Sequence, residues 1–125
     1  MGMQNAGFAA IAARVGGVTE SAFTYLAIGT DNTAHDVTHT TLQAEITDSG
    51  LARASATVSR VTTTVSNDTT QWLKEWTATD SKTIQEIAVL NESTGGDMLC
   101  RTVISPSVGI SSGETYAAMI RVAYA

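Results

Sequence analysis

The stretch TQWLKEWTATDSKTIQEIAVL, residues 70–90, determines the expected fold because it contains two strand-like runs with a turn between them. In its first part, Trp72 and Trp76 fall on one face, since side chains alternate along a strand. Asp80-Ser81-Lys82 supplies turn-forming residues. The segment TIQEIAVL at 83–90 is short and rich in branched apolar residues, as is typical of a strand. The stretch therefore predicts two successive strands.

The same pattern continues on both sides of this stretch. Residues 52–66 place Val among Thr and Ser, which suits a half-exposed strand, and Asn67-Asp68 is typical of a hairpin tip. Residues 115–124 alternate, with every second residue apolar or aromatic, while residues 105–113, around Pro106, predict a loop. The six predicted strands are 22–28, 52–66, 70–79, 83–90, 98–104 and 115–124.

Two short segments have helical patterns. Residues 6–15 predict a helix that begins after Asn5 and stops at Gly16-Gly17. Residues 41–47 predict one or two helical turns, because Thr40 and Gln43 have the spacing of a capping box. The apolar face expected for the first helix consists of Phe8, Ile11, Ala12 and Val15.

These elements predict a mainly β fold. No long helical segments separate the strands, which disfavours a parallel βαβ sheet. We expect an antiparallel β-sandwich or barrel-like domain with one or two short helices. The length of 125 residues suits a single β domain across residues 1–125.

Composition and charge exclude several classes of protein. The net charge is −5, and the seven Lys and Arg residues are spread along the chain, so we expect no nucleic-acid partner. No apolar run is long enough to cross a membrane, and we expect no membrane partner. Cys100 has no second cysteine to pair with, and it lies within an apolar strand pattern that predicts a core position.

The sequence offers little for catalysis or cofactor binding. His35 and His39 are four residues apart, with Asp31 and Asp36 nearby, but the surrounding Thr and Asn predict a loop rather than a metal-binding helix. No nucleophile-elbow pattern and no phosphate-binding glycine loop is present. We therefore expect no enzymatic activity, no metal site and no cofactor.

The two tryptophans leave two interpretations open. Trp72 and Trp76 are spaced to stack on a sugar, as in a receptor-binding module, or to act as core or interface anchors. Because the chain has only seven aromatic residues, a core or interface role is favoured. Four arginines lie in or next to predicted strands, namely Arg53, Arg60, Arg101 and Arg121. They suit cross-strand pairs with Glu75 or Glu86, or bridges from some of them to an acidic neighbour.

Several motifs together resemble a family of small structural proteins of tailed bacteriophages. They are YLAIGT at 25–30, LQAEI at 42–46, EIAVLN at 86–91 and GGDMLCRT at 95–102, in this order. Asp31 stands where the family's strand motif has a second glycine. The resemblance implies a structural role in the virion, as a capsid decoration protein or as a tail-fibre-like protein.

The leading hypothesis is a capsid decoration, or cement, protein on the outer surface of the capsid. Residues 1–17 would form an N-terminal docking arm, the major capsid protein would be the partner, and copies would self-associate as dimers or trimers. The alternative is a tail, baseplate or tail-fibre component that contacts other tail proteins and serves host attachment. The candidate protein-interface residues are Phe8, Ile11, Val15, Trp72 and Trp76.

Overall fold

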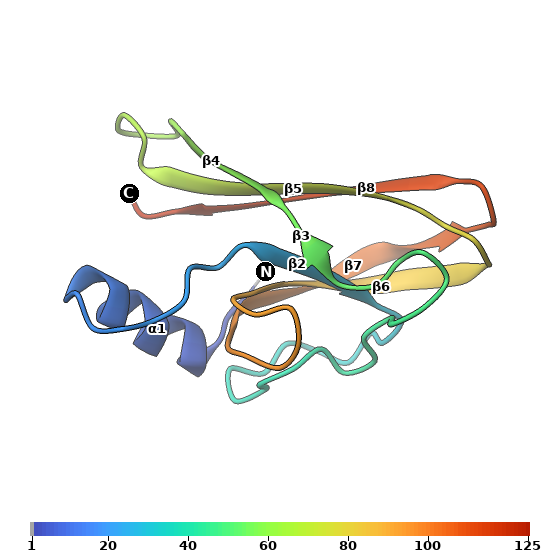
Figure 1. Cartoon of the computed structure of the whole chain (residues 1–125), viewed down its shortest axis with the longest axis horizontal. Helices are drawn as coiled ribbons and strands as arrows, with labels where there is room; N and C mark the ends of the chain where they lie inside the picture. The colour runs from blue at the N-terminus through green and yellow to red at the C-terminus, as the bar shows by residue number, and fades with distance from the viewer. Residues whose placement is uncertain (1) are drawn as a thin grey trace.

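The computed structural model describes residues 2–125, and its regular structure is mainly β (Figure 1). Two antiparallel sheets face each other across a shared core, which confirms the predicted β-sandwich. The larger sheet has the strand order β1-β7-β6-β2-β3, and the smaller sheet has the order β4-β5-β8. The elements are β1 Gly2–Met3, α1 Asn5–Val15, β2 Tyr25–Gly29, β3 Ala54–Ser55, β4 Thr57–Val61, β5 Thr69–Thr77, β6 Lys82–Leu90, β7 Met98–Ile110 and β8 Thr115–Ala123.

The core between the sheets forms from alternate residues of facing strands. Trp72 and Trp76 of β5 are both buried there, against Leu26 and Ile28 of β2. On β8 the same alternation buries one side of the strand and exposes the other, as the sequence predicts. The buried residues of β8 are Ala118, Ile120 and Val122.

β7 is longer than the sequence predicts. The strand continues from the predicted 98–104 segment to Ile110, so the prediction of a loop at residues 105–113 is wrong for residues 105–110. Opposite β6, Val103 pairs with Glu86 but the next recorded pair is Val108 with Ile84, which marks a bulge in β7. Pro106 lies in this bulge, where its missing N–H does not interrupt the ladder.

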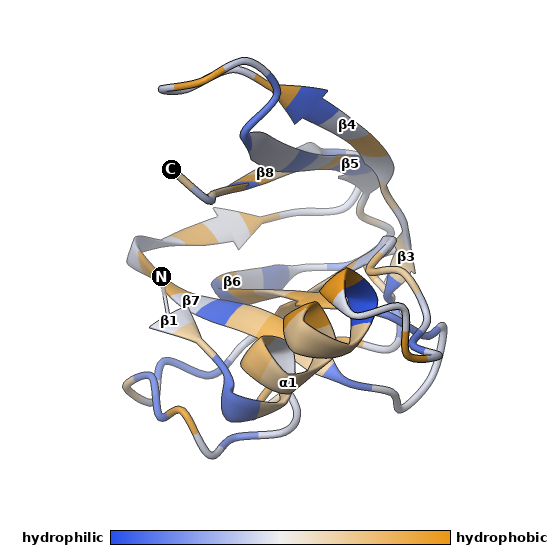
Figure 2. Cartoon of the chain, turned by 90° about the vertical axis from the view of Figure 1, so that its left-hand side faces the viewer, coloured by the Kyte–Doolittle hydropathy of each residue, from blue (hydrophilic) through white to orange (hydrophobic). Residues whose placement is uncertain are grey.

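The helix α1 occupies the predicted position but packs through a different face. Gln4 rather than Asn5 is its N-terminal flanking residue. Gly7 and Ala10 are its buried residues, because the lack of a side chain at Gly7 lets the helix approach the backbone of Leu99 on β7. Of the predicted contact face of Phe8, Ile11, Ala12 and Val15, only Ile11 packs in part against the core, and the other three residues are exposed. Figure 2 shows the largely apolar helix beside the larger sheet.

The predicted helix at 41–47 is not formed. The backbone N–H groups of Gln43 and Ala44 donate to the carboxylate of Glu86, at 2.7 and 3.2 Å, instead of entering a helical turn. Ile46 N donates to Ile28 O at 2.9 Å, which ties the segment to β2. These long-range partners replace the local capping that the sequence suggests.

Residues 1–17, interpreted above as a docking arm, are integrated into the body over the described part. Gly2 and Met3 pair with β7, and the Gln4 side chain is fully buried. Gln4 Nε2 donates to the carbonyl oxygens of Asp36 and His39, both at 2.8 Å. The segment therefore fastens the 35–39 loop to the sandwich and does not project from it.

Candidate functional site

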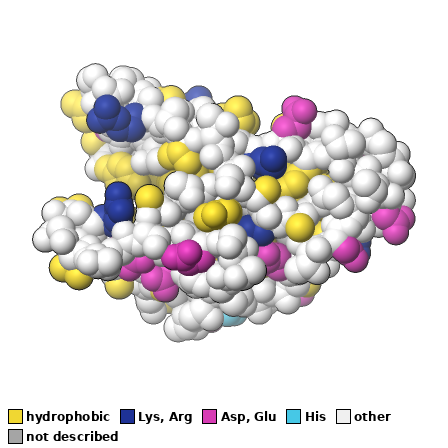
Figure 3. All heavy atoms as spheres, in the orientation of Figure 1, with side chains coloured by type: hydrophobic (Ala, Val, Ile, Leu, Met, Phe, Trp, Pro, Cys, Tyr) yellow, Lys and Arg dark blue, Asp and Glu magenta, His cyan; other side chains and the backbone are white. Residues whose placement is uncertain are grey.

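An apolar groove opens at the end of the sandwich where α1 lies beneath the smaller sheet. Its volume is about 390 Å³. Figure 3 shows the hollow at the left end of the molecule, with apolar side chains exposed around it. The lining residues come from α1, the segment before β2, β4, β5, β7 and the residue after β8. They are Ile11, Arg14, Val15, Ala22, Phe23, Val58, Thr70, Trp72, Leu99 and Tyr124.

Strand register explains why the upper wall of this groove is apolar. Val58 of β4 pairs with Trp72 of β5, and Thr70 pairs with Val122 of β8. Paired residues of antiparallel strands place their side chains on one face, here the face turned toward the larger sheet. Tyr124 continues that face beyond β8, and its backbone N–H donates to Asp68 O at 3.0 Å.

The lower wall is formed by one side of α1. Ile11, Arg14 and Val15 are spaced three and four residues apart, so they lie together on the helix surface. Ile11 is half-buried, whereas Val15 is 85% exposed. Such an exposed apolar residue beside a groove indicates a contact surface rather than a packing position.

The structure brings three of the five predicted interface residues into this groove. Ile11, Val15 and Trp72 all line it, although Trp72 is only 2% exposed and belongs chiefly to the core. Phe8 is 57% exposed on α1 outside the groove. Trp76 is buried deeper in the sandwich, where it stacks with Tyr116 at a centroid distance of 6.3 Å.

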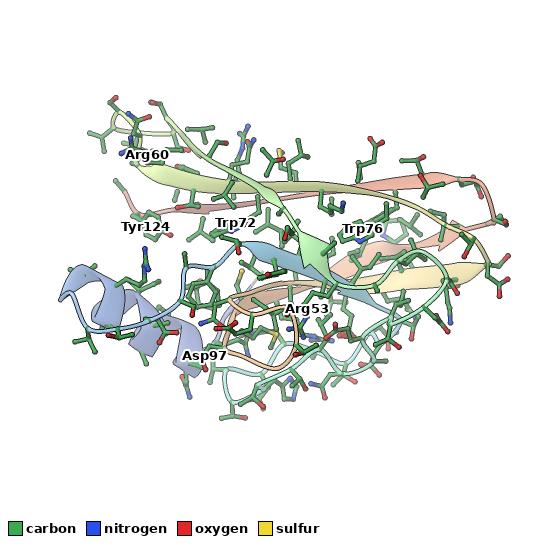
Figure 4. The ribbon with its side chains drawn as sticks, viewed as in Figure 1. Arg53, Arg60, Trp72, Trp76, Asp97 and Tyr124 are labelled. Atoms are coloured by element: carbon green, nitrogen blue, oxygen red, sulfur yellow. The ribbon has the colours of Figure 1, made fainter. Side chains whose placement is uncertain are left out.

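The indole N–H groups of both tryptophans have internal partners. Trp72 Nε1 donates to Phe23 O at 2.7 Å, and Trp76 Nε1 donates to Ala52 O at 2.8 Å. Both rings therefore tie the sheets and their connecting segments together (Figure 4). The sequence left open whether the tryptophans stack on a sugar or act as core or interface anchors. In the structure both are core residues.

Two arginines stand at the rim of the groove. Arg14 Nη1 donates to Glu20 O at 2.9 Å, which keeps its guanidinium near α1. Arg60 is exposed, lies two residues from Val58 on the same face of β4, and belongs to none of the ion pairs within residues 2–125. Figure 4 shows Arg60 at the same end of the molecule as Tyr124 and Trp72. On a chain of net charge −5, this end combines apolar surface with positive charge.

Most of the groove is not predictable from the sequence. Phe23, Val58 and Tyr124 lie in separate segments that only the folded topology brings together. The alternation of β8 did place Tyr124 on the inward face, which was the one available signal. Nothing in the sequence indicated that the larger sheet would leave this end of the inward face uncovered.

His35 contacts the side chain of Gln4, and Cys100 is buried in the core. His35 Nε2 lies 2.7 Å from Gln4 Oε1, and no cluster of three or more potential metal ligands occurs among residues 2–125. Burial raises the pKa of the Cys100 thiol to about 12, so this residue behaves as an apolar core residue. Within the same residues, no helix has the length and apolar character needed to span a membrane.

Apart from the groove, a cluster of polar groups surrounds Arg53, on the side of the 91–97 loop (Figure 4). Its guanidinium binds both carboxylate oxygens of Glu45, at 2.7 and 3.1 Å, and donates to the carbonyl oxygens of Glu92 and Gly95. The expected partner from sequence was Glu75 or Glu86, and the structure replaces it with Glu45. Because its donors are satisfied internally, Arg53 stabilises this loop.

A family model described as Podophage GP4 fiber I protein gp80 matches residues 5–121, which extends from the start of α1 into β8. No curated protein matches the chain.

Proposed function

This chain belongs to the Podophage GP4 fiber I protein gp80 family of phage structural proteins, and from this membership we propose that it is a component of a tail fibre. The family description favours the tail alternative over capsid decoration. In this proposal the β-sandwich is a rigid building block, and the end groove binds another protein of the tail. Its role is structural rather than catalytic.

The observation that carries the proposal is the extent of the family match. Residues 5–121 include α1, β4, β5 and β7, which supply most of the groove. The unit that the family shares is therefore the sandwich together with the elements that form its open end. A role in assembly accounts for both parts, because a rigid scaffold positions a contact surface.

The chemistry of the groove specifies the kind of partner segment. Apolar side chains on both walls favour a partner that buries one or two large apolar residues. Arg14 and Arg60 at the rim favour carboxylates beside those residues, because opposite charges guide association and fix orientation. The expected occupant is an apolar segment with flanking Asp or Glu from a neighbouring tail protein.

Deletion of the gene from the phage distinguishes the tail role from the capsid role. We expect particles with filled, heat-stable heads that lack a fibre component and fail to adsorb to host cells, with adsorption restored by the wild-type chain. Particles that adsorb normally but lose their genome on heating would instead support capsid decoration.

The groove is tested in the same complementation assay. Val15→Asp places a carboxylate in the groove at an exposed position, so we expect a folded chain that fails to restore adsorption. Val37→Asp is the matched control, because Val37 is also exposed but lies outside the groove. Equal complementation by both variants would rule the groove out as the contact.

A further inference from the structure

β8 has a free edge along its whole length. It pairs with β5 on one side, and no strand within residues 2–125 pairs with it on the other. Figure 2 shows β8 and β4 at opposite borders of the smaller sheet. An unpaired strand edge presents backbone donors and acceptors that another strand can bind.

Register identifies which residues of β8 present these groups. Tyr124 N donates to Asp68 O, and Ala78 N donates to Glu114 O, so the even-numbered residues near both ends bond toward β5. Because bonding directions alternate along an antiparallel pair, the odd-numbered residues direct their N–H and C=O groups away from β5. These residues are Thr115, Ala117, Met119, Arg121 and Ala123.

The other strand edges are short or interrupted, and β8 is neither. β1 and β3 have two residues each, and β4 has five. The unpaired part of β7 contains a bulge and Pro106, two features that block edge-to-edge pairing. β8 keeps an unbroken register with β5 over nine residues and contains one charged residue, Arg121.

We propose that β8 pairs antiparallel with β8 of a second copy of this chain, around a two-fold axis at Met119. The two smaller sheets then form one continuous sheet across the dimer. This self-association goes beyond the fibre role proposed above, and it leaves the end groove of each copy unoccupied.

On the outer face of the joined sheet, the two-fold axis brings opposite charges of the two copies close together. Glu75 is paired with Ala117, and Gln71 is paired with Arg121. The two-fold axis sets Arg121 of the second copy opposite Ala117, in one row with Glu75. Within one copy Arg121 Nε donates to Gln71 Oε1 at 2.7 Å, so in the dimer the guanidinium turns toward the free edge. The small side chain of Ala117 leaves room for it to meet the Glu75 carboxylate there.

The centre of the same face is apolar. Leu73 pairs with Met119, and the two are 43% and 53% exposed. At the proposed axis, Met119 of one copy contacts Met119 of the other, with a Leu73 on each side. Four exposed apolar side chains would thus be partly buried by the dimer, which supplies a hydrophobic contribution to association.

Side-chain direction favours a second β8 over β4 as the partner. On β4, the residues that direct backbone groups to the free edge are Val58 and Arg60, whose side chains point to the inner face. On β8 the corresponding side chains point outward. Since paired residues share a face, a β8–β4 contact would join the inner face of one copy to the outer face of the next.

Sedimentation equilibrium of the purified chain over a range of concentrations tests the proposal. We expect a dimer, and Met119→Lys should raise its dissociation constant at least about tenfold, because two ammonium groups meet at the axis. Ser59→Lys, on the outer face of β4, is the matched control and should leave the constant unchanged. Circular dichroism establishes that both variants are folded.

A charge exchange tests the register itself. Glu75→Arg and Arg121→Glu should each weaken the dimer, and the double variant should restore it. In one copy these residues lie four positions apart along the β5–β8 register, so they do not form an internal pair. A monomeric wild-type chain, a trimer, or a dimer unaffected by Met119→Lys would overturn the proposal. A double variant no stronger than the single variants would overturn the assigned register.

Discussion

Glu86 of β6 and Arg101 of β7 form an ion pair that is completely buried, with Glu86 Oε1 and Arg101 Nε 3.5 Å apart. Arg101 Nη1 also donates to Thr33 O at 2.8 Å, while the Glu86 carboxylate accepts the backbone N–H groups of Gln43 and Ala44. The pair therefore fastens the long 30–46 connection to the outside of the larger sheet. This connection contains much of the chain's irregular structure.

Glu86→Gln should destabilise the fold strongly. The substitution leaves the Arg101 guanidinium buried without its main counter-charge, a situation that costs about 3–5 kcal/mol in the free energy of unfolding. Urea denaturation followed by tryptophan fluorescence measures the loss. Asp80→Asn, in the exposed turn before β6, is the control and should change stability by less than about 0.5 kcal/mol. Similar small effects for both variants would contradict the stabilising role of the buried pair.

Gly7→Ala should weaken the attachment of α1. A Cβ at this position would collide with the backbone of Leu99, which cannot move without disturbing β7. We expect a loss of about 1–3 kcal/mol, the usual range for overpacking. Gly16→Ala, just after the C-terminus of the same helix, is the control, because its Cβ would make only ordinary contacts. Thermal unfolding of both variants measures the difference, and an unchanged midpoint for Gly7→Ala would show that the helix does not pack this closely.

Trp76→Phe should be costly even though the ring remains aromatic. The phenyl ring cannot donate to Ala52 O, and it leaves part of the space of the buried indole empty, so we expect a loss of about 1–3 kcal/mol. Tyr124→Phe removes an exposed hydroxyl near Thr70 and should cost less than about 0.5 kcal/mol. Chemical denaturation ranks the two variants. A smaller loss for Trp76→Phe than for Tyr124→Phe would be inconsistent with the indole hydrogen bond.

Asp68 should make the stability depend on pH in the acid range. Its carboxylate accepts the backbone N–H groups of Val65, Thr63 and Thr64, which hold its pKa below the ordinary value of 3.8. The unfolded chain binds this proton more readily, so the contribution to stability is complete above about pH 4 and declines as the pH falls further. The melting temperature of Asp68→Asn, compared with that of the wild type, should therefore show a deficit at pH 7 that shrinks toward pH 2.5. A deficit of constant size would contradict this origin.

Most of the long strands were predictable because their signals are local. The predicted strand at 52–66 is wrong, because it divides into β3 in the larger sheet and β4 in the smaller sheet and ends at Val61. The alternation in 115–124 and the paired tryptophans of 70–79 each specify an inward face, and the structure follows both. The position of α1 was predictable for the same reason. Its packing face was not, because Ile11 and Val15 line a groove and Phe8 is exposed, while Gly7 makes the close contact with the sheet.

Elements that depend on distant partners were not predictable. Residues 41–47 have a helical pattern, but Glu86, far along the chain, binds the N–H groups that a helix would use. The residues of the candidate site also fall into a predictable and an unpredictable group. Ile11, Val15 and Trp72 were expected to be interface residues from their own segments, whereas Phe23 and Tyr124 join them only through the topology of the sandwich.

The most direct measurement of the proposed function is the location of this chain on the phage particle. An epitope inserted in the exposed 92–96 turn, away from both the groove and β8, allows gold labelling of intact particles viewed by electron microscopy. A tail-fibre component should carry gold on the tail fibres, with unlabelled heads. Gold distributed over the capsid surface, with unlabelled tails, would contradict the tail-fibre role.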